Sequence, residues 1–432
     1  MSFRKRMSGV FTGLFTGGEL AENRKNIVIE QLFAGSANTL SGGTLFTGLL
    51  VWLQLSATMI GNISIVTSLG SIFQVFSAIL LRRFRRKKNI VILGKGIVYL
   101  ISIVLIGVVP FLNLSPAISG LVMLILVFLA TFISAVINPG MASWHIRSIP
   151  EEVRNDYFSF FTVASNIVVF GIAFVAGKIA DLFKADGLEL TGLTVLRLAT
   201  VSVCVLDLLW LGKIREYPEE SDHSRISLRF LVKPLLDREY RKNIAAGSLW
   251  AFSSSIAGPY YNLYLLKDMR VAYSTMALVS MTLVVAMICF IPIWSRRIKR
   301  TSYNRTLRLL MRLYPLHYLL LALVTEKTLV LYPVGAIFSY TFYAGIAVIA
   351  ASLPYVHIAS SDQIHYISCY SAMSSLAAIL GTGLGTLFIT LTADFHAMPF
   401  GMPFHNIQLL MVVSAVAMLL CSSPIRNLEN GK

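Results

Sequence analysis

The stretch Leu81-Arg82-Arg83-Phe84-Arg85-Arg86-Lys87-Lys88 stands between two long apolar segments, and about half a chain later it has a counterpart, Ser295-Arg296-Arg297-Ile298-Lys299-Arg300. Each basic stretch is preceded by a second matching segment: Arg24-Lys25-Asn26-Ile27 lies before the first and Arg241-Lys242-Asn243-Ile244 before the second. These separate matches share nearly one offset of about 217 residues, and a fixed offset is the signature of an internal repeat. We therefore expect a chain built from two similar halves.

The composition is that of a protein that crosses a membrane many times. Of the 432 residues, 56% are hydrophobic and 13% are charged, whereas about a quarter of the residues in a soluble domain are charged. The formal net charge of +16 does not indicate nucleic-acid binding, because most Lys and Arg fall in alternate loops and in the two termini. This asymmetry predicts a multi-pass protein of the cell membrane with both termini in the cytoplasm.

Twelve segments approach the length of about 20 apolar residues that a spanning helix needs. They are residues 27–53, 57–81, 90–112, 117–145, 157–183, 190–214, 243–266, 273–294, 307–325, 329–357, 366–392 and 404–421. We expect an all-α membrane protein with twelve transmembrane helices in two pseudo-symmetric six-helix halves. The expected parts are a cytoplasmic leader (1–26), a first half (27–214), a cytoplasmic linker (215–242), a second half (243–421) and a cytoplasmic tail (422–432). In transporters with parallel repeats, the substrate site lies between the halves near the midplane.

Both basic stretches resemble the loop motif of the major facilitator superfamily, Gly-x-x-x-Asp-Arg-x-Gly-Arg-Arg/Lys. The basic positions of the motif correspond to Arg82, Arg85, Arg86, Arg296, Lys299 and Arg300, but the Asp and both glycines are missing in each copy. Two further stretches resemble a bacterial branch of this superfamily: residues 257–264 (AGPYYNLY) and the segment from Trp144 to Phe158. The resemblance covers nearly the whole chain and implies a transporter that works by alternating access. In the family the motif Asp helps to latch the two halves on the cytoplasmic side, and Leu81 and Ser295 stand at its position in the two copies here.

Ionisable groups inside expected spans are candidates for function. Asp207 and Lys95 lie at similar depths in the sixth and third spans, and we expect them to form a structural ion pair, with a proton-relay role for Asp207 as the alternative. Glu30 lies near the inner end of the first span, which lines the cavity in the family that the chain resembles. It is the candidate for proton coupling, with a simple ion pair to Arg24 or Lys25 as the alternative. Arg197, near the outer end of the sixth span, is expected to extend its charge toward the membrane surface.

A polar stripe follows the first span. Gln31, Gly35, Asn38 and Gly42 recur at i, i+4, i+7 and i+11 and therefore share one helical face. Either small-residue helix packing or a cavity-lining face explains this pattern. The repeat offset maps this stripe onto the seventh span. The substrate-cavity candidates there are Ser255, Asn262 and the aromatic residue Tyr261. Neutral polar residues in the fourth and fifth spans complete the set: Asn138 and Asn166.

Tyrosines are concentrated in the second half, and Tyr340 and Tyr343 lie near the middle of the tenth span. Interfacial belts place tyrosines at span ends, so these two are further substrate-cavity candidates. Aromatic faces combined with hydroxyl and amide groups suit a neutral polar ring such as a sugar. They equally suit a lipophilic cation, which binds to ring faces by cation–π contact.

The predicted function is secondary active transport of a small neutral polar solute, such as a sugar or glycoside, with protons as the coupling ion. One alternative function is export of amphipathic, drug-like compounds. A second alternative is a transporter-like membrane sensor. The sequence lacks a Gly-x-x-x-x-Gly-Lys-Ser/Thr motif for ATP. Its outer loops are too short to hold the catalytic cluster of a membrane enzyme. We predict neither enzymatic activity nor a cofactor or metal site.

Overall fold

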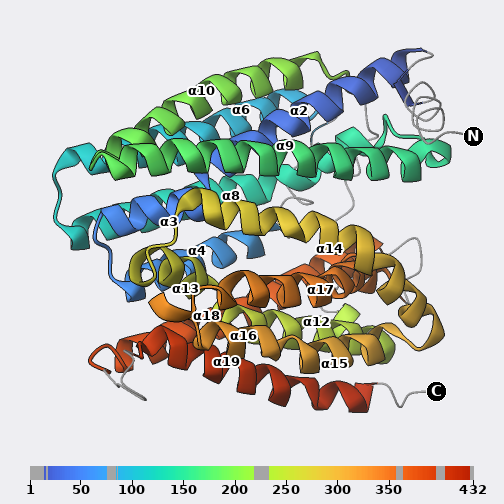
Figure 1. Cartoon of the computed structure of the whole chain (residues 1–432). Coiled ribbons are helices and arrows are strands. Elements are labelled where there is room, and N and C mark those ends of the chain that lie inside the picture. The colour runs from blue at the N-terminus through green and yellow to red at the C-terminus, as the bar shows by residue number, and fades with distance from the viewer. Residues whose placement is uncertain are drawn as a thin grey trace, which may run out of the picture. The chain divides into compact units, whose positions relative to one another are not determined.

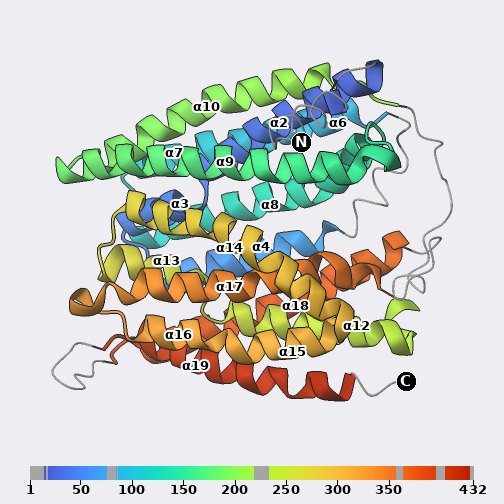
Figure 2. The same ribbon diagram turned by 45° about the vertical axis from the view of Figure 1, so that its right-hand side comes forward.

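The computed structural model describes residues 14–15, 18–74, 84, 86–217, 233–356, 363–395 and 404–428. The regular elements of these residues are all helices (Figures 1 and 2). The chain divides into two compact units, Met1–Leu53 with Phe76–Ser224 (unit 1) and Gln54–Val75 with Arg225–Lys432 (unit 2). The expected all-α class is confirmed.

Unit 1 is organised around three helices from distant parts of the chain. Its elements are α2 (Glu19–Ser41), α3 (Gly43–Trp52), α6 (Lys88–Tyr99), η1 (Leu100–Leu105), α7 (Ile106–Val108), η2 (Val109–Leu112), α8 (Pro116–Ile146), α9 (Glu151–Ala185) and α10 (Glu189–Lys213). Helix α10 packs against α2, α6 and α9, and α6 also packs against α8. Both views show α2, α9 and α10 running alongside one another (Figures 1 and 2). Side chains of α2, α6 and α10 can therefore meet inside the unit.

Unit 2 is built around α18. Its elements are α4 (Ala57–Ile72), α12 (Arg238–Ser255), α13 (Gly258–Leu263), η3 (Tyr264–Asp268), α14 (Tyr273–Arg300), α15 (Tyr303–Leu313), α16 (Pro315–Ala322), η4 (Glu326–Thr328), α17 (Leu331–Ser352), η5 (Leu353–Tyr355), α18 (Gln363–Leu391), α19 (Asn406–Ser422) and η8 (Pro424–Leu428). Helix α18 packs against α4 and α12, while α16 packs against α17 and α19. Helix α4 thus makes its contacts within unit 2, although it comes early in the chain.

Eight helices of the described residues are long and apolar enough to cross a membrane. They span Lys88–Leu112, Pro116–Ile146, Phe160–Ala185, Glu189–Lys213, Tyr273–Arg300, Leu331–Tyr355, Tyr366–Leu391 and Asn406–Arg426. Each corresponds to one of the twelve expected spans.

The four remaining spans coincide with helices that are short or interrupted. Backbone at Gly42 is extended and Gly43 has a positive φ, so the first span divides into α2 and α3. Pro259 and Pro315 begin new helices inside the seventh and ninth spans, because proline has no N–H to continue the hydrogen-bond ladder. Helix α4 is 16 residues long, and the end of its expected span lies outside the described residues.

The third span contains a π-helical turn that changes the expectation for Arg197. In η1 the wider turn frees backbone carbonyls, and Arg197 Nη1 donates to Ser102 O (3.2 Å) and Ile103 O (3.4 Å). The side chain is buried, with Arg197 only 7% exposed. The expectation that it reaches the membrane surface is therefore wrong: the carbonyls of η1 satisfy its donors inside the unit.

Candidate functional site

Three charged side chains meet in the interior of unit 1: Glu30 from α2, Lys95 from α6 and Asp207 from α10. The Lys95 ammonium contacts Glu30 Oε1 and lies 2.7 Å from Asp207 Oδ2. Glu30 and Asp207 are fully buried, and Lys95 is 7% exposed. Lys95 is seven residues from the start of α6 and Asp207 six from the end of α10, so both lie about 10 Å inside their helices.

Two apolar clusters enclose this charge cluster. On one side of it along α2, α6 and α10 are Ile27 and Val28, Val91 and Leu211, which pack together with Trp144 and Tyr157. On the other side are Ala37, Ile103 and Cys204, which form a second buried cluster with Tyr99. The three charges therefore lie between two apolar layers, where a low dielectric strengthens their mutual attraction.

Hydrogen bonds distinguish the two carboxylates. Asp207 Oδ2 accepts from the Tyr99 hydroxyl at 2.8 Å in addition to its contact with Lys95. Glu30 Oε1 accepts from Lys95. The second oxygen of each group, Glu30 Oε2 and Asp207 Oδ1, is buried without a hydrogen-bond partner. Such buried polar atoms are uncommon in proteins and mark positions that a proton, an ion or water can occupy.

The expected Lys95–Asp207 pair is confirmed, and Glu30 joins it. The alternative partner for Glu30, Arg24, instead donates to the backbone oxygens of Leu14 (3.0 Å) and Ser148 (3.3 Å). The sequence contained the signal for a three-membered cluster, because all three charges fall toward the inner ends of their spans. What it lacked was the knowledge that α10 contacts both α2 and α6.

The residues of the polar stripe on α2 have different surroundings. Gln31 Nε2 lies 3.4 Å from Nδ1 of His145, which is buried on α8 and has no partner for its Nε2 atom. Gly35 packs against α9, where a Cβ atom would come within 3.2 Å of Val169. Asn38 is exposed. Close helix packing therefore explains Gly35, whereas Gln31 belongs to the polar surroundings of the charge cluster.

Unit 2 holds a group of aromatic and hydroxyl side chains at the two proline breaks. Pro259 has no N–H for the Ser255 carbonyl, which accepts instead from Thr382 Oγ1 at 3.3 Å. Tyr318 OH donates to the neighbouring Ser254 carbonyl at 3.4 Å. Beside it, Ser339 Oγ donates to Tyr314 OH at 3.1 Å.

Aromatic rings of α12, α13 and α17 and at the start of α16 extend this group. The Tyr314 ring lies 5.3 Å from Trp250, and the Tyr261 ring lies 6.3 Å from Tyr332. Tyr340 interacts with the hydroxyl of Ser280. Of these rings, Trp250, Tyr314, Tyr318 and Tyr332 were missed by the sequence analysis, because span-end tyrosines cannot be told from inward-facing ones by position alone.

The other expected cavity residues are spread over both units. Asn262 and Ser255 are half-buried beside the break at Pro259, and Tyr343 is 37% exposed on α17. In unit 1, Asn166 is half-buried on α9 and Asn138 is exposed on α8. Four expected cavity residues lie on helices that carry the aromatic group: Ser255, Tyr261, Asn262 and Tyr340. Asn138 and Asn166 do not belong to the charge cluster.

Sequence and structure comparisons give the family. The profile of the Major Facilitator Superfamily matches residues 27–382. The chain belongs to this superfamily. Among curated proteins no match was found.

Solved structures of transporters share the superfamily fold at low sequence identity. A bacterial homologue of the iron transporter ferroportin, in its inward-facing state, aligns with a TM-score of 0.72 and 14% identity, covering 96% of this chain and 100% of that one. A mutant of the nucleoside transporter NupG gives 0.70 and 14%, with coverage of 95% and 100%. A D-xylose–proton symporter gives 0.62 and 13%, with coverage of 91% and 96%. At these identities the likeness shows the fold and leaves the substrate open.

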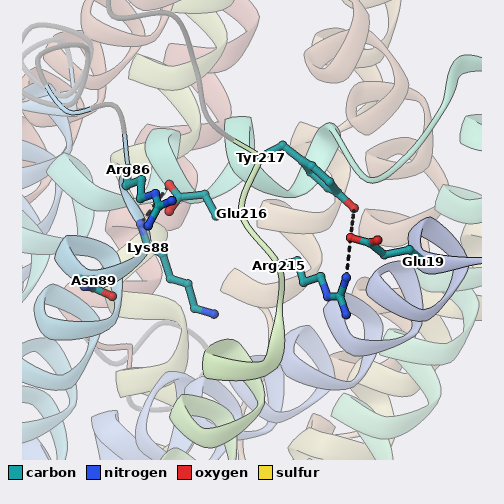
Figure 3. A pocket seen from close by; sticks show the side chains of 7 residues that line it. All are labelled: Glu19, Arg86, Lys88, Asn89, Arg215, Glu216 and Tyr217. Carbon is teal, nitrogen blue, oxygen red and sulfur yellow. Dashed lines mark hydrogen bonds and ion pairs between the residues drawn. The ribbon is translucent and has the colours of Figure 1, made fainter.

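The superfamily loop motif contributes to a polar pocket of about 510 Å³ at the end of α6 and α10 in unit 1 (Figure 3). Its lining residues are Glu19, Arg86, Lys88, Asn89, Arg215, Glu216 and Tyr217. Lys88 Nζ donates to the terminal carbonyls of Gly212 (2.6 Å) and Ile214 (2.9 Å). Glu216 Oε1 accepts from the backbone N–H groups of Lys87 and Lys88 at the start of α6.

A second set of contacts holds the other wall of this pocket. Figure 3 shows Arg215 and Tyr217 both directed at Glu19; the Arg215–Glu19 ion pair measures 2.8 Å and the Tyr217 hydroxyl lies 3.4 Å from the same carboxylate. The Glu19 carboxylate raises the pKa of Arg215, and burial together with Glu19 raises the pKa of Tyr217. The pair is largely exposed and so contributes little stability.

The remaining motif positions have separate outcomes. Arg86 is exposed at this pocket, and Arg296, Lys299 and Arg300 are exposed in the last turns of α14, where cations interact favourably with the carboxyl end of a helix. Arg82 and Arg85 lie outside the described residues.

Proposed function

We propose that the protein is a secondary active transporter that moves a small neutral polar solute, such as a sugar or glycoside, by alternating access. The observation that carries this proposal is the chemistry of unit 2. The buried polar side chains described there are neutral hydroxyls and amides together with His317, and none is Asp, Glu, Lys or Arg. Tyrosine and tryptophan rings lie among them. Such side chains offer hydrogen bonds and flat apolar faces without a fixed charge, which suits a polar ring.

We further propose that protons drive transport and that Glu30 is the coupling group. A buried carboxylate beside a lysine can take up and release a proton as its surroundings change. Replacement of Glu30 by Gln is expected to abolish uphill transport driven by a pH gradient. Unchanged uphill transport would show that Glu30 is not the coupling group.

A specific observation also favours a second function, the export of amphipathic compounds. The paired rings of Trp250 with Tyr314 and of Tyr261 with Tyr332 present faces to which lipophilic cations bind. The solved transporters of similar fold are described as carrying nucleosides, metals or D-xylose with protons. They therefore support transport of a small molecule and do not choose among substrates.

Ligand-dependent thermal stabilisation of the purified full chain separates the two functions. One panel contains neutral sugars, glycosides and nucleosides, and the other contains lipophilic cations. A ligand at a hundred times its dissociation constant adds about 2.7 kcal/mol to the free energy of unfolding. The first panel is expected to stabilise the protein, and this gain should fall in Tyr314→Phe but persist in Tyr355→Phe, whose ring is exposed. Stabilisation by the second panel alone would support export.

Flux of the stabilising compound into proteoliposomes completes the test. Accumulation that depends on a pH gradient is expected. Binding without flux would overturn the transporter and support a membrane sensor.

We also propose a position in the cell membrane with both termini in the cytoplasm. The halves that move would be residues 27–214 and 243–421, with the linker 215–242 between them, as the repeat and the distribution of basic residues indicate. Single cysteines introduced at positions 2 and 431 of a chain without its native cysteines should react with a membrane-impermeant maleimide only after the cells are opened. Labelling of intact cells would contradict this topology.

A further inference from the structure

The charges of the cluster Glu30–Lys95–Asp207 in unit 1 do not balance. The cluster holds two carboxylates, Glu30 and Asp207, and one ammonium group, Lys95, all nine-tenths or more buried. With every group ionised, the cluster has a net charge of −1 between two apolar layers. An uncompensated buried charge is strongly destabilising. One added proton makes the cluster neutral.

The geometry shows which carboxylate is better suited to take this proton. Asp207 Oδ2 accepts both from Lys95 at 2.7 Å and from the Tyr99 hydroxyl at 2.8 Å. Glu30 Oε1 accepts from Lys95, and each of the two carboxylates has a second oxygen that is buried without a partner, so the Tyr99 hydroxyl is the contact that distinguishes Asp207. Hydrogen bonds donated to a carboxylate stabilise its ionised form. The ionised form of Asp207 is therefore the better stabilised of the two carboxylates. Protonation of Glu30 costs less free energy than protonation of Asp207.

We propose that Glu30, Lys95 and Asp207 form a binding site for one exchangeable proton, in which Glu30 carries the proton and Asp207, held by Tyr99, is the positioning residue that retains Lys95. With the proton bound, the carboxylic acid of Glu30 lies beside a neutral Lys95–Asp207 pair. When the proton leaves, Lys95 is shared between two carboxylates and the cluster gains one negative charge. The inference rests on the proposed coupling role of Glu30 and adds the residues that set its protonation.

The surroundings of the site come from every helix that packs against it. They contribute Arg24 from α2, Tyr99 from α6, His145 from α8, Tyr157 from α9 and Cys204 from α10. Arg24 is held by two backbone carbonyls, and His145 lies within electrostatic range of Lys95. None of these groups supplies a carboxylate, so a carboxyl signal from the cluster belongs to Glu30 or Asp207.

Infrared difference spectroscopy of the full chain in lipid tests this proposal without a substrate. The carboxyl C=O band of a buried acid is followed through a pH titration in H2O and in D2O. The wild type is expected to show one exchangeable buried band at neutral pH. Glu30→Gln should lose it, and Asp207→Asn should lose it too, because Glu30 and Lys95 then form a neutral pair that needs no proton.

Gentler variants guard against misfolding of Asp207→Asn. Asp207→Glu keeps the charge and should keep the band. Tyr99→Phe removes one donor from Asp207, so proton affinity rises and the midpoint should move upward by about one pH unit. Asp186→Asn, at an exposed carboxylate after α9, is the matched control and should leave the titration unchanged.

Three results would overturn the proposal: a band that survives Glu30→Gln, a band that persists unchanged in Asp207→Asn, or a wild type that shows no exchangeable band and is instead stabilised by sodium ions. The infrared result is independent of flux. A normal infrared titration in a protein that transports nothing would contradict the proposed function and still support the proton site. Normal proton-driven flux without a protonated carboxyl band would contradict the proton site and still support the transport function.

Discussion

Lys95 holds together a cluster that would otherwise consist of two repelling carboxylates. Its ammonium contacts Glu30 and Asp207 at once, and its position 5.8 Å from the centre of the Tyr99 ring adds an aromatic neighbour. Charges this deeply buried persist only when they are paired. At the scale of single residues, the interior of unit 1 therefore depends on one lysine more than on either acid.

Replacing Lys95 by Met tests this dependence. The change leaves two buried carboxylates without their cation, and we expect a loss of about 3–5 kcal/mol of stability. Thermal unfolding in detergent measures it, with Lys178→Met at an exposed position of α9 as the control. Adding Glu30→Gln and Asp207→Asn to Lys95→Met should recover much of the loss, because the site is then neutral. A Lys95→Met protein as stable as the wild type would contradict this interpretation.

Glycines allow helices of unit 2 to approach closely. A Cβ atom on Gly381 or Gly385 of α18 would overlap the backbone carbonyls of Phe252 and Ile256. On α4, Gly61 faces the Tyr260 hydroxyl and Thr386, which are hydrogen-bonded at 2.9 Å. These contacts explain why α18 lies at the centre of the unit.

Gly61→Val is expected to disrupt the contact between α4 and α18. The added side chain must displace the Tyr260–Thr386 hydrogen bond, and overpacking of this kind costs about 1–3 kcal/mol. Gly171→Ala is the control, because a Cβ atom on Gly171 meets nothing within 4 Å. The measurement is the thermal midpoint of unfolding. Equal midpoints for Gly61→Val and wild type would show that α4 shifts to accommodate the added side chain without a loss of stability.

A side chain from outside α6 caps its first turn. Lys87, at the N-cap, provides no side-chain hydrogen bond, whereas Glu216 accepts from two backbone N–H groups there. Loss of an N-cap costs about 1 kcal/mol. We expect Glu216→Ala to lower stability by about this amount and to increase hydrogen exchange at the start of α6. Glu326→Ala, at an exposed glutamate of η4, should do neither. Unchanged exchange at α6 would exclude the cap.

At the scale of the whole molecule, buried charge is segregated between the two units. The buried Asp, Glu, Lys and Arg side chains among the described residues are Arg24, Glu30, Lys87, Lys95, Arg197 and Asp207, all in unit 1. Unit 2 contributes neutral polar and aromatic groups. This separation suggests that ion coupling and solute recognition reside in different units.

The two roles should therefore respond separately to substitution. Glu30→Gln should abolish the pH dependence of flux and change the KM for the solute by less than about threefold. Tyr314→Phe should raise that KM by about tenfold, the equivalent of one lost hydrogen bond, and leave the pH dependence intact. Both are measured in proteoliposomes with the compound selected by thermal stabilisation. Parallel changes in both parameters from either variant would contradict the separation.

Much of the fold follows from local properties of the chain. Apolar length predicts the spans, and helices are interrupted at Pro259 and Pro315, where proline has no N–H to continue the hydrogen-bond ladder. Pro139 and Pro292, by contrast, lie inside α8 and α14. Burial of Arg197 could not be predicted, since it depends on a π-helical turn about 95 residues earlier in the sequence. Nor could the aromatic group of unit 2, because helical periodicity does not say which face meets a neighbour.

The sequence by itself determined that this chain is an all-α membrane protein, since hydropathy is a property of order along the chain. The two repeated halves stay a prediction from the repeat offset. The sequence also supplied Glu30, Lys95 and Asp207 as separate candidates. Only the tertiary structure decided that they form one site with Tyr99, and that α4 packs within unit 2. The physical reason is that a buried charge takes the partner that helix packing brings within contact distance, and packing joins residues more than a hundred positions apart.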